Sequence, residues 1–442
     1  MTAATLARPV TARTTAGRAQ LLPFALAVGF VMATMASRSN AIAALVTVGA
    51  VLVAVGRILV TGRMDRISWA ASAYLGWQLL FGMAVGAGPA HASDLGRFVS
   101  YDGRVFVAFL PFLAYGTIRT VHADLELLRR LLRWTVVANL ALFAGGLMHV
   151  VPGVVHKGHY YGFTSSHHVP GLFFGVVAVL LGVAPSAARL VSDRAFALGA
   201  VLLVGGSGSR TSAVGLLLAA IYLVWSAPDL RVRVRGVVVV VSGVILALLL
   251  SGRLLSTVEF IGSSDFVGSA STEFSQADQA DTGKQLNSTS PGDAALSNVL
   301  IRFGVWRAGI DEFARSPLIG IGSWRLDDGD RTYTGVTGLA DVATGGTAIH
   351  DGGFGAHNLV LQTLAENGIV GLVLLVWPWS LLVRRFRRIS GTAGRAGIAM
   401  VVFGAGTTLT SNSLVSPALC FTLLVCAMTI ARLSPEPGPP SP

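Results

Sequence analysis

The sequence predicts an all-α integral membrane protein with about twelve transmembrane helices and one large extracytoplasmic loop. Of its 442 residues, 53% are hydrophobic and only 12% are charged, and the mean hydropathy is +0.66. This composition is too apolar for an ordinary soluble domain. Apolar runs that approach the roughly 20 residues needed to cross about 30 Å of hydrocarbon recur along the chain. Basic residues gather in alternate loops between these runs.

The predicted spans follow one another in chain order. They lie near residues 21–37, 41–60, 68–87, 105–118, 134–151, 168–184, 195–207, 211–226, 236–251, 359–383, 396–410 and 414–431. The seventh and eighth runs are so close that they form either one span or two, and we count two. An arginine-bearing leader precedes the first run, and we expect an uncleaved helix there because further spans follow. The chain is thus divided into spans one to nine (1–251), an extracytoplasmic loop (252–356), and spans ten to twelve with a cytoplasmic tail (357–442).

The distribution of charge orients these spans. The chain carries 33 basic and 22 acidic residues, a net charge of +11. Most basic residues fall in the loops that a cytoplasmic N-terminus places inside, which is the positive-inside pattern and predicts that both termini are cytoplasmic. The positive charge is explained by this topology and by attraction to anionic lipid, so we predict no nucleic-acid partner. The two cysteines, Cys420 and Cys426, share the last run and exclude a disulfide framework or a cysteine metal site.

The long outer loop has three parts. Residues 262–293 are small and polar, and we expect them to be flexible. From Val299 to Phe313, apolar residues recur every three or four positions, which predicts an amphipathic helix that lies on the membrane or caps the bundle. Pro317 ends this helix, and the glycines of PLIGIG at 317–322 indicate a tight turn. On the cytoplasmic side, residues 122–133 predict either a short basic amphipathic helix or a plain connector.

Almost every charge lies at the edge of a span, which favours chemistry at the outer membrane face over an ion-coupled path through the bilayer. Three arginines gather on that face: Arg210 in GGSGSRTSA, and Arg302 and Arg307 on the amphipathic helix. A guanidinium binds phosphate in a bidentate way without losing its proton, and a lipid diphosphate is the anion expected there. The alternative is that these arginines are interfacial and reach toward lipid headgroups. Further candidates for diphosphate contact, or for interface anchoring, are Arg97 and Arg104.

A polar cluster opens the tenth span. His357 is a candidate general base because a neutral imidazole can accept a proton near neutral pH. Asn358 is a good N-cap for the helix that follows. Gln362 and Glu366 share the face of Asn358 and either position the imidazole or an acceptor, or bond to neighbouring helices. A straight helix from 359 to 383 would be about 37 Å long and would hold His357 at the membrane rim, where an interfacial histidine is the alternative.

Other clusters are weaker. His156, His159, His167 and His168 lie in HKGHYYGFTSSHH and suggest sugar or headgroup contact, or a metal site. No carboxylate accompanies them and their spacing fits no zinc helix. The run DDGD at 327–330 lacks the spacing of a calcium loop and predicts a solvated turn. We therefore predict no metal and no cofactor.

The motifs together resemble a known family. His357 and Asn358 are followed by nine residues, Gly368, two residues and Gly371, which is similar to the signature of the O-antigen ligase and O-antigen polymerase family. The stretches LQTLAENGIVGL, GSRTSA at 208–213, and RFGVWRAGIDEF followed by PLIGIG strengthen the likeness, which covers most of residues 160–380. The resemblance implies that His357 is the essential histidine and that Arg210 and Arg302 are the two functional arginines.

The resemblance implies a glycosyltransferase of the bacterial cytoplasmic membrane, acting in surface or exopolysaccharide biosynthesis. We expect it to be metal-independent, because arginine charge can replace a metal on a diphosphate leaving group, and inverting, because a single displacement inverts the anomeric configuration. The donor would be an undecaprenyl-diphosphate-linked glycan, and the acceptor hydroxyl would belong to a glycan, a lipid or a protein. Whether the enzyme is a ligase or a polymerase stays open. The alternative function is a transporter or flippase of lipid-linked glycans.

Overall fold

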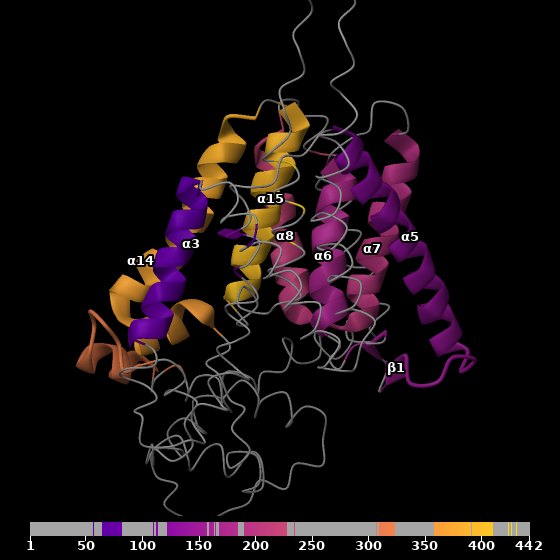
Figure 1. The fold of residues 1–442 in the computed structure, drawn as a ribbon. Helices are drawn as coiled ribbons and strands as arrows, with labels where there is room; N and C mark the ends of the chain where they lie inside the picture. The colour runs from indigo at the N-terminus through magenta and orange to yellow at the C-terminus, as the bar shows by residue number, and fades with distance from the viewer. Residues whose placement is uncertain are drawn as a thin grey trace, which may run out of the picture.

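The protein is described here from a computed structural model. It describes residues 64–81, 122–156, 159–162, 164, 168–183, 190–227, 309–322, 358–389 and 391–409, and the single positions 56, 109, 112, 113, 234, 306, 423, 426 and 430. This part of the chain is mostly helical, which confirms the all-α class (Figure 1). The spans predicted at 21–37 and 236–251 lie outside the described residues, and those at 41–60, 105–118 and 414–431 lie mostly outside them.

Seven helices and one hairpin make up the labelled elements of Figure 1. The helices are α3 (Arg66–Trp77), α5 (His122–Leu147), α6 (His168–Val183), α7 (Leu190–Ser207), α8 (Arg210–Trp225), α14 (Leu359–Arg387) and α15 (Gly391–Thr408). The antiparallel hairpin pairs β1 (Val155–His156) with β2 (His159–Tyr160). Each helix overlaps one predicted span, and the two closely spaced runs are two separate helices, α7 and α8.

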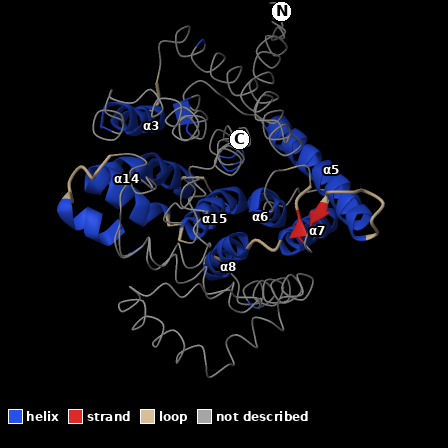
Figure 2. Cartoon of the chain, turned by 90° about the horizontal axis from the view of Figure 1, so that it is seen from below, coloured by secondary structure: helices blue, strands red, loops and turns tan. Residues whose placement is uncertain are grey.

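The helices pack as a bundle in which α15 holds a central place. Figure 2 shows α15 between α14 on one side and α6 and α8 on the other. Beyond α14 lies α3, and beyond α6 lie α7 and then α5. Close packing is possible because glycines meet bulky neighbours: a Cβ on Gly175 of α6 would lie 2.2 Å from a ring carbon of Phe403 on α15. Such a glycine lets one helix receive the aromatic ring of another.

Contacts at both ends of α8 fix its direction relative to α14. The guanidinium of Arg395 donates to the carbonyl of Ser226 at 3.3 Å, which joins the start of α15 to the end of α8. Toward the other end, a Cβ on Gly406 would lie 3.0 Å from the Cα of Gly215. Thus α15 runs antiparallel to α8, and it is also antiparallel to α14, to which a short connection joins it. It follows that α8 and α14 run parallel and begin at the same end of the bundle.

The stretch 122–133 is part of a helix that continues through the predicted span, so the boundary expected near residue 134 is wrong. Four buried apolar residues, Leu125, Leu128, Leu132 and Val136, follow one another at three- and four-residue steps across that boundary. A stripe with this period packs as one helix face, and no proline interrupts it. Helix α5 therefore extends without a break into the bundle.

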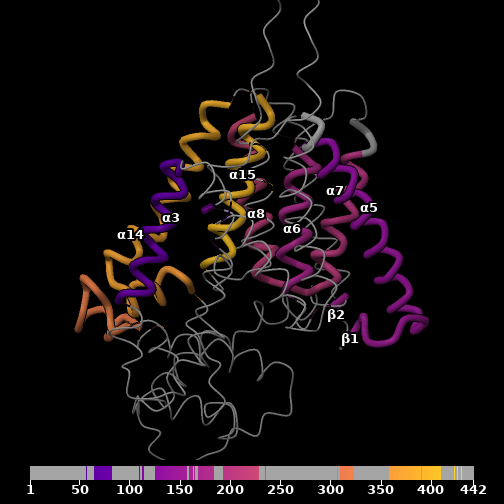
Figure 3. Tube along the Cα trace, viewed as in Figure 1, coloured from indigo at the N-terminus to yellow at the C-terminus, as the bar shows by residue number. Residues whose placement is uncertain are grey.

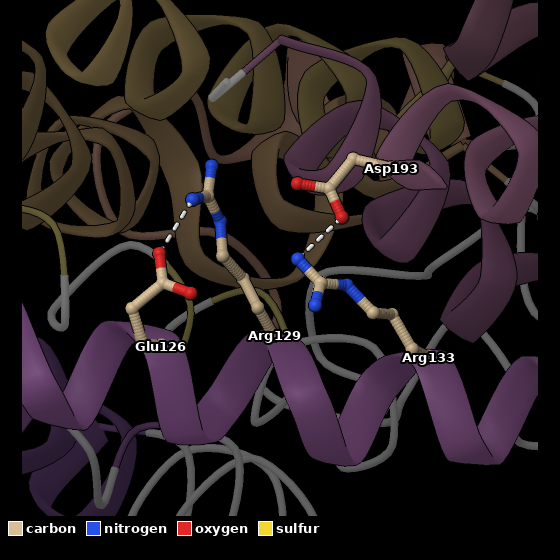
Figure 4. A network of polar contacts seen from close by, with 4 residues as sticks. All are labelled: Glu126, Arg129, Arg133 and Asp193. Carbon is tan, nitrogen blue, oxygen red and sulfur yellow. Dashed lines mark hydrogen bonds and ion pairs between the residues drawn. The ribbon is translucent and has the colours of Figure 1, made fainter. Parts of the chain in front are cut away.

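Buried charges join α5 to α7 (Figure 4). The Arg133 guanidinium forms an ion pair with the carboxylate of Asp193 at 2.5 Å, and Asp193 is only 2% exposed. One turn away, Arg129 is buried and donates to Glu126 at 3.0 Å. A buried charge is tolerated when a partner compensates it, so Arg133 and Asp193 fix where α7 lies along α5.

The hairpin is tied to the opposite end of α5. The Tyr160 hydroxyl donates to the side-chain oxygen of Asn139 at 2.6 Å, and its ring lies edge-on to Phe143 with centroids 5.3 Å apart. Burial raises the pKa of the Tyr160 phenol above its ordinary value, so the hydroxyl stays protonated and keeps donating. Figure 3 shows the hairpin beside the lower ends of α5 and α7. On the α7 side, a Cβ on Gly208 would lie 2.3 Å from Nδ1 of His159.

Within the part of the chain that is described, α14 is the one helix with both the length and the apolar composition to cross a membrane. Helices α6 and α8 are also apolar but shorter. The basic residues in the last turn of α14, Arg384, Arg385 and Arg387, suit a helix C-terminus because its dipole is negative there. The count of twelve spans and the cytoplasmic placement of both termini stay predictions.

Removing one member of the buried ion pair is expected to destabilise the protein. Asp193→Ala leaves Arg133 without its carboxylate and should lower the free energy of unfolding by about 3 kcal/mol. Replacing both residues, as in Asp193→Ala with Arg133→Leu, should recover most of that loss because no unpaired charge remains. Thermal unfolding of the purified protein in detergent measures both variants. A double variant no more stable than the single one would contradict this account.

Candidate active site

The helices α6, α8 and α14 all begin at one end of the bundle, which we call the substrate end. Nδ1 of His168, the first residue of α6, lies 3.4 Å from Oγ of Ser209, which caps α8. The start of α14 lies at this end too, because α14 runs parallel to α8. Helix N-termini present unpaired N–H groups and the positive end of the helix dipole, so this end suits an anion. On the predicted topology it faces outward.

Arg210 is held at the substrate end by a tight connection between α7 and α8. Gly208 has a φ of +65°, a left-handed conformation that glycine adopts without strain. Ser209 then caps α8, and its side chain accepts from the backbone N–H of Ser212 at 3.3 Å. Arg210 is therefore the first residue of α8, and its side chain is exposed. The structure thus leaves this predicted site residue accessible to a ligand.

Sequence reasoning missed the serines below Arg210. Ser207, Ser209 and Ser212 are buried, and the hydroxyl oxygens of Ser209 and Ser212 lie 2.8 Å apart. Gly171 of α6 fits directly against them, since a Cβ there would lie 2.7 Å from Oγ of Ser207. The spacing of an N-cap serine and a residue three positions later was the available signal. These contacts fix the connection that presents Arg210.

Asn358 caps α14 as predicted. Its backbone is extended, with φ −144° and ψ 103°, and its side-chain oxygen accepts from the N–H of Leu361 at 3.1 Å. An N-cap satisfies one of the donors that a helix start leaves unpaired. His357 directly precedes this cap in the sequence and lies outside the described residues.

Gln362 and Glu366 lie on the buried face of the first turns of α14. They are 4% and 5% exposed, and the Gln362 amide donates to the Glu366 carboxylate at 3.3 Å. A carboxylate with so little exposure needs polar partners, and Gln362 supplies one. The structure thus brings these two predicted residues together, on the same short stretch of helix that Asn358 opens.

Helix α14 is broken at Gly368, so the predicted continuous helix from 359 to 383 is wrong. Gly368 has φ 65° and ψ −167°, a region of backbone conformation that is essentially restricted to glycine. On the predicted topology, the part before the break is an outer half-helix, 359–367, and the part after it is an inner half-helix, 369–387. At 1.5 Å per residue the inner half-helix is about 28 Å long, close to the thickness of the hydrocarbon core. The outer half-helix is therefore not an overhang of one straight rod.

A segment of the predicted outer loop, 317–322, fills the break, and we call this contact the clasp (Figure 1). A continuous helix would join the N–H groups of Ile369 and Val370 to the carbonyls of Ala365 and Glu366. Instead, all four groups bond to the loop. The hydrogen bonds run from Ile369 N to Pro317 O at 2.9 Å, from Val370 N to Leu318 O at 3.2 Å, from Ile321 N to Ala365 O at 3.0 Å and from Gly322 N to Glu366 O at 2.9 Å. Two helical bonds are thus replaced by four bonds between segments.

Two glycines make the clasp possible. A Cβ on Gly320, whose φ is +73°, would lie 2.3 Å from the carbonyl oxygen of Glu366. On the other side, a Cβ on Gly368 would lie 2.3 Å from the carbonyl oxygen of Leu318. Both distances are too short for any real side chain, and the atoms they would meet belong to the backbone. The predicted turn at PLIGIG is present, but its glycines serve close contact with α14.

The amphipathic helix predicted in the outer loop is seen over residues 309–315 and ends before Pro317 as predicted. It packs on the outer half-helix, because a Cβ on Gly309 would lie 3.2 Å from Cγ of Leu361. Within it, Arg315 donates to the buried Glu312 carboxylate at 2.8 Å. The described loop segment thus contacts α14 at Leu361 and again at the break.

Several predicted site residues fall outside the described part of the chain. They are Arg97, Arg104, Arg302, Arg307 and His357, and their roles stay predictions. Of the predicted histidine cluster, His156 and His159 lie on the hairpin and His168 begins α6. Among the described residues, no group of three or more His, Cys, Asp or Glu side chains is placed to hold a metal ion, and metal independence stays a prediction.

Substituting Gly368 should destabilise the protein much more than substituting a glycine in open space. Gly368→Ala forces a side chain into a glycine-only conformation and against Leu318, which should cost about 2 kcal/mol or more. The matched control is Gly76→Ala in α3, where no atom lies within 4 Å of the added Cβ. That control should leave stability unchanged or raise it by up to about 1 kcal/mol. Equal melting temperatures for the two variants would contradict the clasp geometry.

Residues 195–376 match the O-Antigen ligase family model, a stretch that begins in α7 and ends in α14. The match includes Arg210, both segments of the clasp and the buried Gln362–Glu366 pair. No curated protein matches the chain. Proteins of this family are membrane proteins, and the match supports a ligase or transferase activity. The resemblance to the O-antigen ligase family is therefore confirmed over residues 195–376.

Proposed function

We propose that the protein is a membrane glycosyltransferase that transfers or polymerises an undecaprenyl-diphosphate-linked glycan onto an acceptor hydroxyl. The observation that carries this proposal is the shared substrate end: exposed Arg210 begins α8 at the end where α14 begins, directly after His357 in the sequence. A cation for the donor and a base for the acceptor are the two groups that such a transfer needs. The family match supports the same general reaction.

Donor binding is assigned to arginines. Arg210 and Arg302 hold the diphosphate and neutralise the charge that grows as the sugar leaves, and the N-termini of α6 and α8 add their dipoles. Diphosphate is already a competent leaving group, so arginine charge can replace the metal that many transferases use. Arg307, Arg97 and Arg104 are assigned to secondary contacts with the same donor.

His357 is assigned to the acceptor. Its neutral imidazole takes the proton of the acceptor hydroxyl as the oxygen attacks the anomeric carbon. The bond from that carbon to the phosphate oxygen breaks at the same time, and undecaprenyl diphosphate departs with the electron pair. A single displacement of this kind inverts the anomeric configuration. Asn358 fixes the start of α14 beside the histidine, and the Gln362–Glu366 pair positions the imidazole or the acceptor from the next turns.

Arg210 is expected to contribute to donor binding through its charge. Arg210→Ala removes charge-assisted hydrogen bonds of about 1.5 to 3 kcal/mol and should lower kcat/KM for the lipid-linked donor about 10- to 100-fold. The matched control is Arg194→Ala, which removes another exposed arginine from α7 at the opposite end of the bundle. Transfer assays with purified lipid-linked donor measure both variants. An equal loss in both would show that Arg210 has no special role.

Replacing His357 separates an enzyme from a flippase. His357→Ala should reduce glycan transfer about 100-fold or more because it removes the general base, while flipping of the donor continues. Mass analysis of lipid-linked intermediates in cells carrying this variant then defines the acceptor. Accumulated single repeat units would indicate a polymerase, and accumulated full-length polymer on the lipid would indicate a ligase. Full transfer by the variant would refute the mechanism, and loss of flipping would favour the transporter.

A further inference from the structure

We propose that the clasp positions the outer half-helix of α14 for the reaction, and that Gly320 is a positioning residue which acts through this half-helix. The inference rests on the proposed function because it concerns the same site. It assigns to the loop segment 317–322 a role in holding the acceptor side of the site. The segment does so through the four main-chain hydrogen bonds of the clasp.

The outer half-helix depends on the clasp because the break at Gly368 interrupts the helical hydrogen bonds that would join it rigidly to the inner half-helix. An intact α-helix transmits orientation through successive N–H to carbonyl bonds, and two of these bonds are absent at the break. The carbonyls of Ala365 and Glu366 bond to Ile321 and Gly322 instead. The direction of the half-helix is therefore set by the loop and by side-chain packing, and only weakly by the inner half-helix.

The outer half-helix carries the polar residues of the acceptor side. Asn358 caps it, and Gln362 and Glu366 form their hydrogen-bonded pair on its buried face. The loop also contacts Glu366 itself, since Gly320 lies against its main-chain carbonyl and Gly322 donates to that carbonyl. A displacement of the clasp thus displaces the Glu366 backbone directly.

An earlier part of the loop, at Gly309, also contacts the half-helix, which makes the loop and the half-helix a single unit. Gly309 lies against Leu361, more than a turn before Glu366 on the half-helix. Between the two contacts the loop forms its helix over 309–315 and the turn at Pro317. The N–H of Gly320 donates to the carbonyl of Ser316 at 2.9 Å, which stiffens this turn. Two contacts joined by a short ordered segment resist rotation as well as translation.

Breaking the hydrogen bonds of the clasp should lower the turnover number, kcat. A reacting group misplaced by about 1 Å can cost up to about 100-fold in rate, so we expect Gly320→Ala to lower kcat about 10- to 100-fold. Arg210 lies on α8, which makes none of the clasp hydrogen bonds. The KM for the lipid-linked donor should therefore change less than kcat.

The experiment compares Gly320→Ala with Gly391→Ala in the full-length protein. Both glycines have positive φ, +73° and +78°, but a Cβ on Gly391 would meet no atom within 4 Å. The two substitutions thus impose similar backbone strain, but only Gly320→Ala also disturbs the clasp. Initial transfer rates are measured per folded protein, together with hydrogen exchange of peptides covering 317–322 and 365–372. We expect lost protection in both peptides and reduced kcat in Gly320→Ala only.

A second variant keeps the test informative if Gly320→Ala folds poorly. Ile369→Pro removes the N–H that bonds to Pro317, at the first position of the inner half-helix, where proline is tolerated. It should reproduce the loss of protection and of kcat. Lost protection with unchanged kcat in either variant would overturn the positioning role, as would an equal fall in kcat for Gly391→Ala. Failure of the proposed function would appear separately, as full transfer by Arg210→Ala and His357→Ala with the exchange results unchanged.

Discussion

The pairing of main-chain groups at the break in α14 is the constraint on which the rest of the structure depends. In an apolar environment an N–H or carbonyl without a partner costs several kcal/mol, so a spanning helix can be interrupted only where other protein groups bond to the exposed backbone. The segment 317–322 supplies these groups at Gly368. Because of this, the segment 317–322 is part of the bundle's architecture, and the two halves of α14 can point in different directions.

The bundle brings chemically different groups that are far apart in the sequence to one end of the molecule. Helix α15 lies between α8 and α14 and runs antiparallel to both, so the starts of the two flanking helices share an end. Arg210 comes from one of them and the Asn358 cap from the other. The buried Arg133–Asp193 pair lies at the start of α7, away from the connection that presents Arg210, and fixes α7 on α5. Helix α7 in turn contacts the hairpin near the same end as Arg210. Packing and charge thus both serve the site that we assign to glycan transfer.

The sequence predicts the helices well because their apolar runs are long and the signals at their ends are local. The cap at Asn358, the separation of α7 from α8 and the helix end before Pro317 all follow from residues close in sequence. The break at Gly368 could not be predicted in this way. Its main-chain groups bond to a segment more than forty residues earlier, and periodicity reports only the average environment of a helix face. The glycines of PLIGIG and of LQTLAENGIVGL contribute to the resemblance to the family. Their spacing alone does not reveal that Gly320 and Gly368 occupy complementary positions.

A contact made by main-chain atoms restricts amino-acid substitution at some of its positions and not at others. The side chains beside it, such as Leu318 at 65% exposure and Ile369 at 45%, are exposed and can change as long as they remain apolar. Gly320 and Gly368 have no such freedom, since any side chain would meet backbone. Related proteins could therefore diverge until little sequence similarity remains across this region and still form the same main-chain contact. Two glycines on separate segments, rather than overall identity, would then be the trace by which a distant member is recognised.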